Sequence, residues 1–355
     1  MKRLKYIGMD VHLATISMVV LNAAGKVMME VTIATQAGAI LDFIDGVSGT
    51  LHVTFEEGTY AEWLYDLLLP KVAGVVVCDP RRTPRRRGEN KSDRIDARQL
   101  AEWLRLGTLK SVYHGNAERR ALKELAKSYL ALVGDTTRVM NRLKALYRAR
   151  GIACKGTRVY SIQLRPQWLE QLREPGVRGR AELLYQELDL LRPLRQQARA
   201  AMIAESRKQP AHKILCSIPS LGPVRSALLM AILQTPHRFR GKRQLWTYAG
   251  LALVTRSSAN YQLVNGQLTR SRKPVLIVGL NANHHHALKA IFKDAAVSAL
   301  AHPGPLQEFY AARVAQGIKP ELARLTLARK IAWLTLNLWK KGERFNAQHL
   351  KPQAA

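Results

Sequence analysis

Acidic side chains are scarce in this sequence of 355 residues, where 26 Asp and Glu stand against 56 Lys and Arg. The formal net charge at pH 7 is therefore +30. Such an excess of positive charge favours a polyanionic partner, because each Lys or Arg that contacts a phosphate releases a condensed counterion. We therefore expect nucleic acid as the partner.

Long uncharged apolar runs are missing as well, although 47% of the residues are apolar. No segment reaches the ~18 consecutive apolar residues that a membrane-spanning helix needs. The first residues, MKRLKYIGMDVH, reach Asp10 before the apolar core of a signal peptide could form. The sequence thus predicts a cytoplasmic protein with no membrane partner.

Cysteine is also rare, and its three copies, Cys78, Cys154 and Cys216, lie far apart in the sequence. Their odd number argues against a disulfide framework, and their spacing argues against a zinc site built on thiolates. We expect them to be buried thiols.

The first 80 residues alternate strand and helix patterns. Residues 5–34 predict an antiparallel meander of three strands, with a tight turn at Asn22–Gly25. The segments after it predict, in order, a helix (37–47), a strand (51–56), a helix (60–70) and a strand (73–80). Strands that alternate with helices add to a sheet in parallel, so an α/β domain is expected here.

The rest of the chain reads as mainly helical, and its length allows about two domains at ~100–200 residues each. Ser92 is placed to cap a helix. Long helical patterns at about 116–150 and 178–208 could form an antiparallel arm, with a turn region at 163–179 between them. Two helices around a Gly-containing turn follow from about 212, and another amphipathic helix spans 320–345.

Two aspartates three positions apart, Asp93 and Asp96, occur in the stretch KSDRIDARQLAEWL. At ~100° per residue they share a helical stripe with apolar residues such as Ala97 and Leu100, whereas the arginines lie on the other side. The stripe predicts that the two carboxylates turn inward. Unpaired charge is costly there, so an arginine or a metal ion has to compensate it.

Two further acidic positions favour the metal. Asp10 lies in the apolar first strand, where Asp is otherwise disfavoured, and Glu56 and Glu57 end the fourth strand. If these two strands are neighbours, their acids converge where the helix of Asp93 can cover them. Oxygen donors of this kind suit one or two Mg²⁺ ions. Two ions ~4 Å apart can stabilise both the attacking and the leaving oxygen of a phosphodiester.

Basic and aromatic side chains near these acids are candidates for binding nucleic acid. We expect the following residues to bind its backbone: Arg81, Arg82, Arg85, Arg86, Arg87, Lys91 and Arg256. Four aromatic residues could stack on bases, although their apolar surroundings equally suit a protein core: Tyr60, Trp63, Trp246 and Tyr248.

The order of five motifs resembles the DEDD transposases of bacterial insertion-sequence family 110, over residues 5 to 345. These motifs are YIGMDVH, TFEEGTYAEWL, NKSDRIDARQLAEW, SIPSLGPVRSALLMAI and RFRGKRQLWTYAGLALVTRSS. The resemblance implies an α/β RNase H-like (RuvC-like) catalytic domain at 1–112, a helical coiled-coil arm at 113–210 and a mainly α C-terminal transposase domain at 211–355 that carries a catalytic serine.

The same resemblance implies site residues and partners. The four acids that bind Mg²⁺ would be Asp10, Glu56, Asp93 and Asp96, and the nucleophile would be Ser258. Glu57 and Ser257 remain alternatives, because Glu56 is followed by only one residue before Gly58, and Ala259 replaces the glycine that follows the family's serine. Members of the family act as multimers on donor and target DNA, and they are guided by a structured noncoding bridge RNA. They work on the bacterial nucleoid.

Two other functions remain open from the residues alone. A RuvC-like nuclease would use the same acids to activate water, without a covalent step and without a need for Ser258. An inactive nucleic-acid-binding protein would explain the charge of +30. That second alternative gives no reason for four acids at converging positions.

Overall fold

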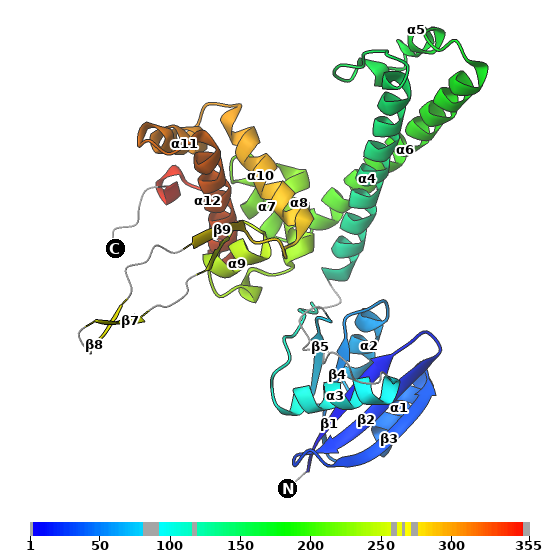
Figure 1. The fold of residues 1–355 in the computed structure, drawn as a ribbon, viewed down its shortest axis with the longest axis vertical. Coiled ribbons are helices and arrows are strands. Elements are labelled where there is room, and N and C mark those ends of the chain that lie inside the picture. The colour runs from blue at the N-terminus through cyan, green and yellow to red at the C-terminus, as the bar shows by residue number, and fades with distance from the viewer. Residues whose placement is uncertain are drawn as a thin grey trace. The chain divides into compact units, whose positions relative to one another are not determined.

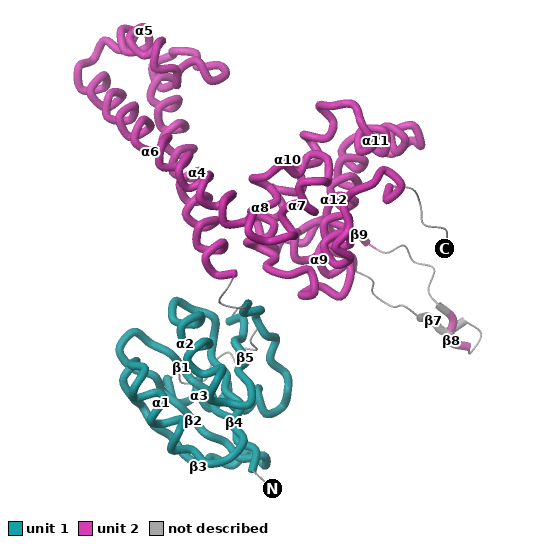
Figure 2. The backbone as a smooth tube through the Cα atoms, turned by 180° about the vertical axis from the view of Figure 1, so that it is seen from behind, with its two compact units in different colours: residues 1–115 teal, residues 116–355 magenta. Residues whose placement is uncertain are grey.

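The computed structural model describes residues 3–80, 92–115, 119–256, 261–264, 267–270 and 276–350. The chain divides into two compact units, residues 1–115 and residues 116–355, which Figure 2 shows in teal and magenta. Each unit has its own hydrophobic core. Among the described residues, no helix combines the length and the apolar character needed to cross a membrane.

The first unit is built on a mixed five-stranded sheet in the order β3-β2-β1-β4-β5 (Figure 1). Its strands are β1 (Leu4–Val11), β2 (Thr15–Asn22), β3 (Val27–Ala34), β4 (Thr50–Glu56) and β5 (Gly74–Cys78). The first three strands are antiparallel, whereas β4 is parallel to β1 and β5 is parallel to β4. The α/β class and the meander expected from the sequence are thus confirmed.

The turn between β2 and β3 shows why the meander forms where the sequence places it. The side-chain oxygen of Asn22 accepts hydrogen bonds from the backbone amides of Ala24 and Lys26. Gly25 adopts a positive φ of 84°, which a residue without Cβ reaches at little cost. The side chain of Asn22 therefore closes the turn that Gly25 permits.

Three helices cover the two faces of this sheet. The helices α1 (Ala37–Gly46) and α2 (Ala61–Leu68) share a core with inward side chains of β1 such as Ile7 and Met9. On the other face lies α3 (Asp93–Arg105), whose Ala97 and Ala101 pack on β2. Because side chains alternate along a strand, Gly8 and Asp10 of β1 face α3.

The second unit contains a two-helix arm. Its helices α4 (Arg120–Arg148) and α6 (Pro175–Arg207) pack on each other, and a separate core at one end joins residues such as Leu143 and Tyr185. The other end belongs to the main core of the unit through Leu122 and Met202. The two helices therefore run antiparallel, as expected. The region 163–179 is more than a turn, because it contains α5 (Arg165–Glu170) and the beginning of α6.

The remaining elements form a helical body. Its helices are α7 (Ala211–Cys216), α8 (Pro223–Leu233), α9 (Lys242–Tyr248), α10 (His286–Leu300), α11 (Pro305–Ala315) and α12 (Pro320–Lys341). The strands β6 (Leu253–Arg256) and β9 (Leu276–Leu280) form one pair, and β7 (Tyr261–Val264) and β8 (Gln267–Arg270) form another. These strands were not expected from the sequence, because each is only four or five residues long and lies in or beside a segment rich in Ser and Arg. The arm and this body share one core.

A substitution at Gly8 tests the contact between β1 and α3. A Cβ atom at this position would overlap the carbonyl oxygen of Ala97 and lie 2.5 Å from the amide nitrogen of Ala101. Gly8→Ala should therefore destabilise the first unit by about 1–3 kcal/mol, the usual cost of overpacking. Calorimetry and hydrogen exchange of peptides from β1 and α3 would measure the loss.

The matched control is Gly38→Ala in α1, where an added Cβ meets no atom within 4 Å. This change should leave the unit unaffected or stabilise it by up to about 1 kcal/mol, because Ala is the better helix former. Equal stability of the two variants would contradict the close approach of β1 and α3.

Candidate metal centre

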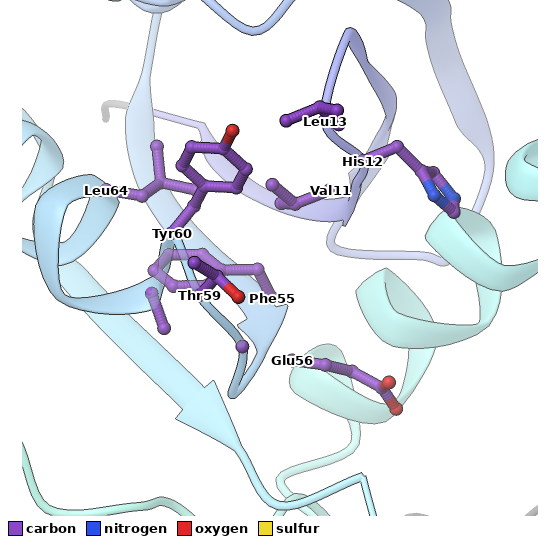
Figure 3. Close-up of a pocket in the computed structure, with 10 residues that line it drawn as sticks. Val11, His12, Leu13, Phe55, Glu56, Thr59, Tyr60 and Leu64 are labelled. Atoms are coloured by element: carbon purple, nitrogen blue, oxygen red, sulfur yellow. The ribbon is translucent and has the colours of Figure 1, made fainter. Parts of the chain in front are cut away.

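Asp10 and Glu56 lie at the carboxyl ends of two neighbouring parallel strands. Met9 of β1 pairs with Phe55 of β4, and Asp10 and Glu56 are the next residues on each strand. Because Met9 and Phe55 point into the core under α1 and α2, the two acids point to the opposite face. In Figure 3 the Glu56 side chain extends towards the helix on that face. The parallel pairing thus places both carboxylates on the side of α3.

The first turn of α3 adds further acids to this edge of the sheet. Ser92 begins the helix, since its side-chain oxygen accepts a hydrogen bond from the Ile95 amide at 3.3 Å. Asp93 and Asp96 both lie in the first turn. Ala97, one turn further along, contacts Gly8 of β1. The tight contact at Gly8 therefore brings the first turn of α3 to the end of β1, where Asp10 lies.

His12 links the strand and the helix. Its Nε2 atom lies 3.0 Å from Oδ2 of Asp10 and 3.7 Å from Oδ1 of Asp93. One potential ligand atom from each of Asp10, His12 and Asp93 lies within 4.8 Å of the other two. Two carboxylates and one imidazole at this separation could bind one divalent cation.

The charges of the cluster act on one another. Burial raises the pKa of Asp10, the hydrogen bond with His12 opposes that rise, and the negative charges of Asp93 and Asp96 add to it. The same hydrogen bond raises the pKa of His12 above its ordinary value. Three carboxylates thus repel one another where a protonated histidine or a bound cation would relieve the repulsion.

The burial of Asp93 and Asp96 differs from the sequence prediction. The helix face is as expected, because Ala97 and Leu100 on the same stripe are buried. Asp93 and Asp96 themselves are exposed, and the Asp93 side chain keeps 59% of its accessible surface. They lie at the open end of the sheet, one turn before the helix reaches the strands. Acids in a first turn also stabilise a helix through its dipole.

Glu56 and Glu57 have different surroundings. The Glu57 carboxylate lies 2.8 Å from Nε2 of His114, whose ring stacks on Tyr65. Glu56 is half-buried and shares the face of Asp10. Neither carboxylate is among the ligand atoms of Asp10, His12 and Asp93 that lie within 4.8 Å of one another. Glu56 would lie on the strand adjacent to a cation that Asp10 and Asp93 bind.

His12 was not among the residues that the sequence analysis selected. Its position two residues after Asp10 was the available signal, but a histidine just past a strand is common and carries little meaning alone. Several expected residues lie outside the described part of the chain: Arg81, Arg82, Arg85, Arg86, Arg87, Lys91, Ser257 and Ser258. Arg256 ends β6, and only its backbone is described.

Comparison with known proteins connects both units to transposition. A family model of DEDD type for IS110, described as a transposase, matches residues 7–149. A second model, described as a transposase of the IS116/IS110/IS902 family, matches residues 212–311. The chain is also 22% identical over 397 residues to an uncharacterized 44.8 kDa protein of insertion element IS116 from Streptomyces clavuligerus, with 93% of this chain and 94% of that protein covered.

The contact between Asp10 and His12 predicts the titration of the imidazole. Asp10→Asn should lower the pKa of His12, because the substitution removes the carboxylate that stabilises the protonated ring. In the wild type the contact stabilises the fold at low pH, and this contribution is lost as the pH rises through the folded-state pKa of His12. NMR titration of the histidine ring protons in the metal-free protein would measure both variants.

Glu57→Gln is the matched control, because it removes a carboxylate from a different histidine, His114. It should leave the His12 titration unchanged. An unaltered His12 pKa in Asp10→Asn would show that the contact does not form in solution.

Proposed function

Because the chain belongs to the DEDD transposases of the IS110 family, we propose that it moves its insertion sequence by a Mg²⁺-dependent reaction in which Ser258 attacks DNA. Membership of this family identifies the protein as a DNA transposase and its substrate as DNA. It also indicates a divalent cation. We further propose that the cation is Mg²⁺, that the nucleophile is a serine and that a guide RNA takes part.

The described residues fit a divalent cation. The ligand atoms of Asp10, His12 and Asp93 lie within 4.8 Å of one another, and Asp96 is close enough to raise the pKa of Asp10. Asp10, Glu56, Asp93 and Asp96 would hold the ion, since Mg²⁺ prefers carboxylate oxygens and keeps several waters. When bound, Mg²⁺ would polarise a phosphate and neutralise charge that develops on its oxygens.

The convergence of Asp10 and Asp93 carries this part of the proposal. Asp10 belongs to a central strand, and Asp93 belongs to a helix that follows the arginine-rich segment in sequence. Only the fold brings these two distant residues together. A helix that simply presented acids to solvent would have no reason to place them beside the buried end of β1. His12 would hold the two carboxylates together when no cation is bound.

Ser258 is proposed as the nucleophile. A bond forms between its Oγ atom and phosphorus as a phosphoester bond of the DNA strand breaks. The oxygen that leaves takes up the proton that the serine gives up, and attack by the hydroxyl of another strand reverses the step and joins the ends. The arginines at 81–87, with Lys91 and Arg256, would hold the DNA backbone.

The relationship also supports the partners. We propose that a structured bridge RNA selects donor and target DNA, and that the protein acts as a homo-oligomer on the bacterial nucleoid. The net charge of +30 suits a protein that holds two kinds of nucleic acid. A hydrolytic RuvC-like nuclease remains the second candidate, because the acid cluster alone would serve it equally well.

Metal binding by the cluster can be measured without DNA. Asp10→Asn and Asp93→Asn should each weaken the binding of Mn²⁺, used as a paramagnetic probe for Mg²⁺, at least about tenfold. Glu57→Gln should bind the ion like the wild type, because its carboxylate pairs with His114. Electron paramagnetic resonance with Mg²⁺ competition would give the affinities. Equal affinity in all variants would exclude the cluster as the metal site.

The serine step requires a recombination assay with the element and its flanking noncoding DNA. Asp93→Ala and Ser258→Ala should both abolish excision and integration, whereas Ser257→Ala should remain active. A covalent adduct of protein and DNA should appear on denaturing gels with Ser257→Ala and be absent with Ser258→Ala. Cleavage that persists in Ser258→Ala but not in Asp93→Ala would favour the hydrolytic nuclease.

A further inference from the structure

A pocket of about 330 Å³ opens at the carboxyl ends of β1 and β4 (Figure 3). Its lining includes the fully buried side chains of Phe55 and Leu64. Val11 and Tyr60 also line it, and the figure shows the Tyr60 ring between Leu64 and Val11. The accessible lining therefore combines polar and apolar surface in similar amounts, and the Tyr60 ring lies along one side.

The pocket adjoins the acid cluster. His12 lines the pocket and also bonds to Asp10, and Glu56 lines the pocket while sharing the strand face of Asp10. The two sites therefore meet at the end of the sheet, the cluster on the face of α3 and the pocket on the face of α2. A nucleotide whose phosphate is held at the cluster would therefore lie close to the pocket.

Two exposed apolar side chains occur at or near this pocket. Leu13, in the turn between β1 and β2, lines the pocket and leaves 80% of its surface exposed. Trp63 is 38% exposed, and its ring meets that of Tyr60 edge-on, with 6.1 Å between ring centroids. Neither side chain belongs to the core under α2.

We propose that this pocket takes one unstacked base of the DNA strand that is cut at the cluster. The inference rests on the proposed function, because it takes the occupant to be a DNA strand on which this protein acts. Tyr60 stacks on the base, and Leu13 occupies the space that the base leaves in the DNA. The hydroxyl group of Thr59, which also lines the pocket, can bond to the edge of the base.

The chemistry of the pocket favours a nucleobase over other occupants. A base is flat and needs a ring to stack on and hydrogen-bonding groups at its edge, and Tyr60 and Thr59 supply these at the pocket. The chain carries a net charge of +30, which draws a polyanion to its surface. Exposed leucines are used as wedges between base pairs by proteins that bend or open DNA. A stacked duplex could not reach the pocket, so the strand must be open there.

The test uses the full-length protein and single-stranded DNA oligonucleotides that share the sequence of the cut end. Each carries one 2-aminopurine, placed at successive positions along the series, and Ca²⁺ replaces Mg²⁺ so that the strand is held without being cut. Stacking on a tyrosine should quench the fluorescence of 2-aminopurine at one position beside the scissile phosphate. Tyr60→Ala should abolish that quenching and weaken binding about tenfold, whereas Tyr60→Phe should retain it.

Matched variants distinguish the role of Leu13 as a wedge from the effect of a general loss of apolar surface. Leu13→Ala should reduce binding to a duplex of the same sequence more than binding to the single strand, because only the duplex has to be opened. Met28→Ala, at a 53% exposed position on β3, should bind both like the wild type. Thermal unfolding of each variant would confirm that the fold is intact.

An abasic nucleotide at the responsive position gives the decisive comparison. With it, wild type and Tyr60→Ala should bind equally, since the base that Tyr60 contacts is gone. Persistent weakening by Tyr60→Ala on abasic DNA, or quenching at no position, would overturn the proposal. Stronger quenching with RNA of the same sequence would assign the pocket to RNA and would also overturn the proposal.

The Mn²⁺ affinity of the cluster and the Tyr60-dependent quenching can change independently. If Asp93→Asn still binds Mn²⁺ normally while Tyr60-dependent quenching is present, the cluster assignment fails and the base site stands. If the metal affinities follow the prediction and quenching is absent at every position, the base site fails and the metal centre stands.

Discussion

The close approach of β1 and α3 at Gly8 is the contact on which the candidate centre depends. With no Cβ on Gly8, the backbone of α3 at Ala97 and Ala101 can lie directly on the strand. This position of the helix sets its first turn beside the end of β1, where Asp93 comes within 3.7 Å of His12. A larger residue at Gly8 would push the helix outward and separate Asp93 from Asp10, although neither acid would be altered.

A second constraint is electrostatic. The cluster gathers Asp10, Asp93 and Asp96 in a chain that otherwise has an excess of basic residues, and burial of Asp10 makes the repulsion among them more costly. A fold retains such an arrangement when a cation compensates it, and the hydrogen bond from His12 to Asp10 supplies part of that compensation. The same histidine lines the neighbouring pocket. Metal binding and base binding would therefore be linked through His12.

The second unit is held together by two separate hydrophobic cores. Its arm is anchored because Leu122 of α4 and Met202 of α6 belong to the core of the helical body, while the other end has its own core around Tyr147 and Tyr185. The hydroxyl groups of these two tyrosines lie 3.2 Å apart, and burial raises the pKa of both. The arm is thus an extension of the helical body with a second core at its far end.

Hydrophobic periodicity in the sequence was sufficient to predict the strands and helices of the first unit and the two arm helices, and the residue type of Ser92 predicted the cap of α3. It also selected the acids, because Asp10 in an apolar strand and Asp93 on an apolar stripe violate local preferences. Periodicity could not reveal the exposure of Asp93, since a helix face does not show where the sheet beneath it ends. Nor could it identify His12 or the pocket beside Tyr60. These arise where β1, β4, α2 and α3 meet, and contacts between residues distant in sequence exist only once the chain has folded.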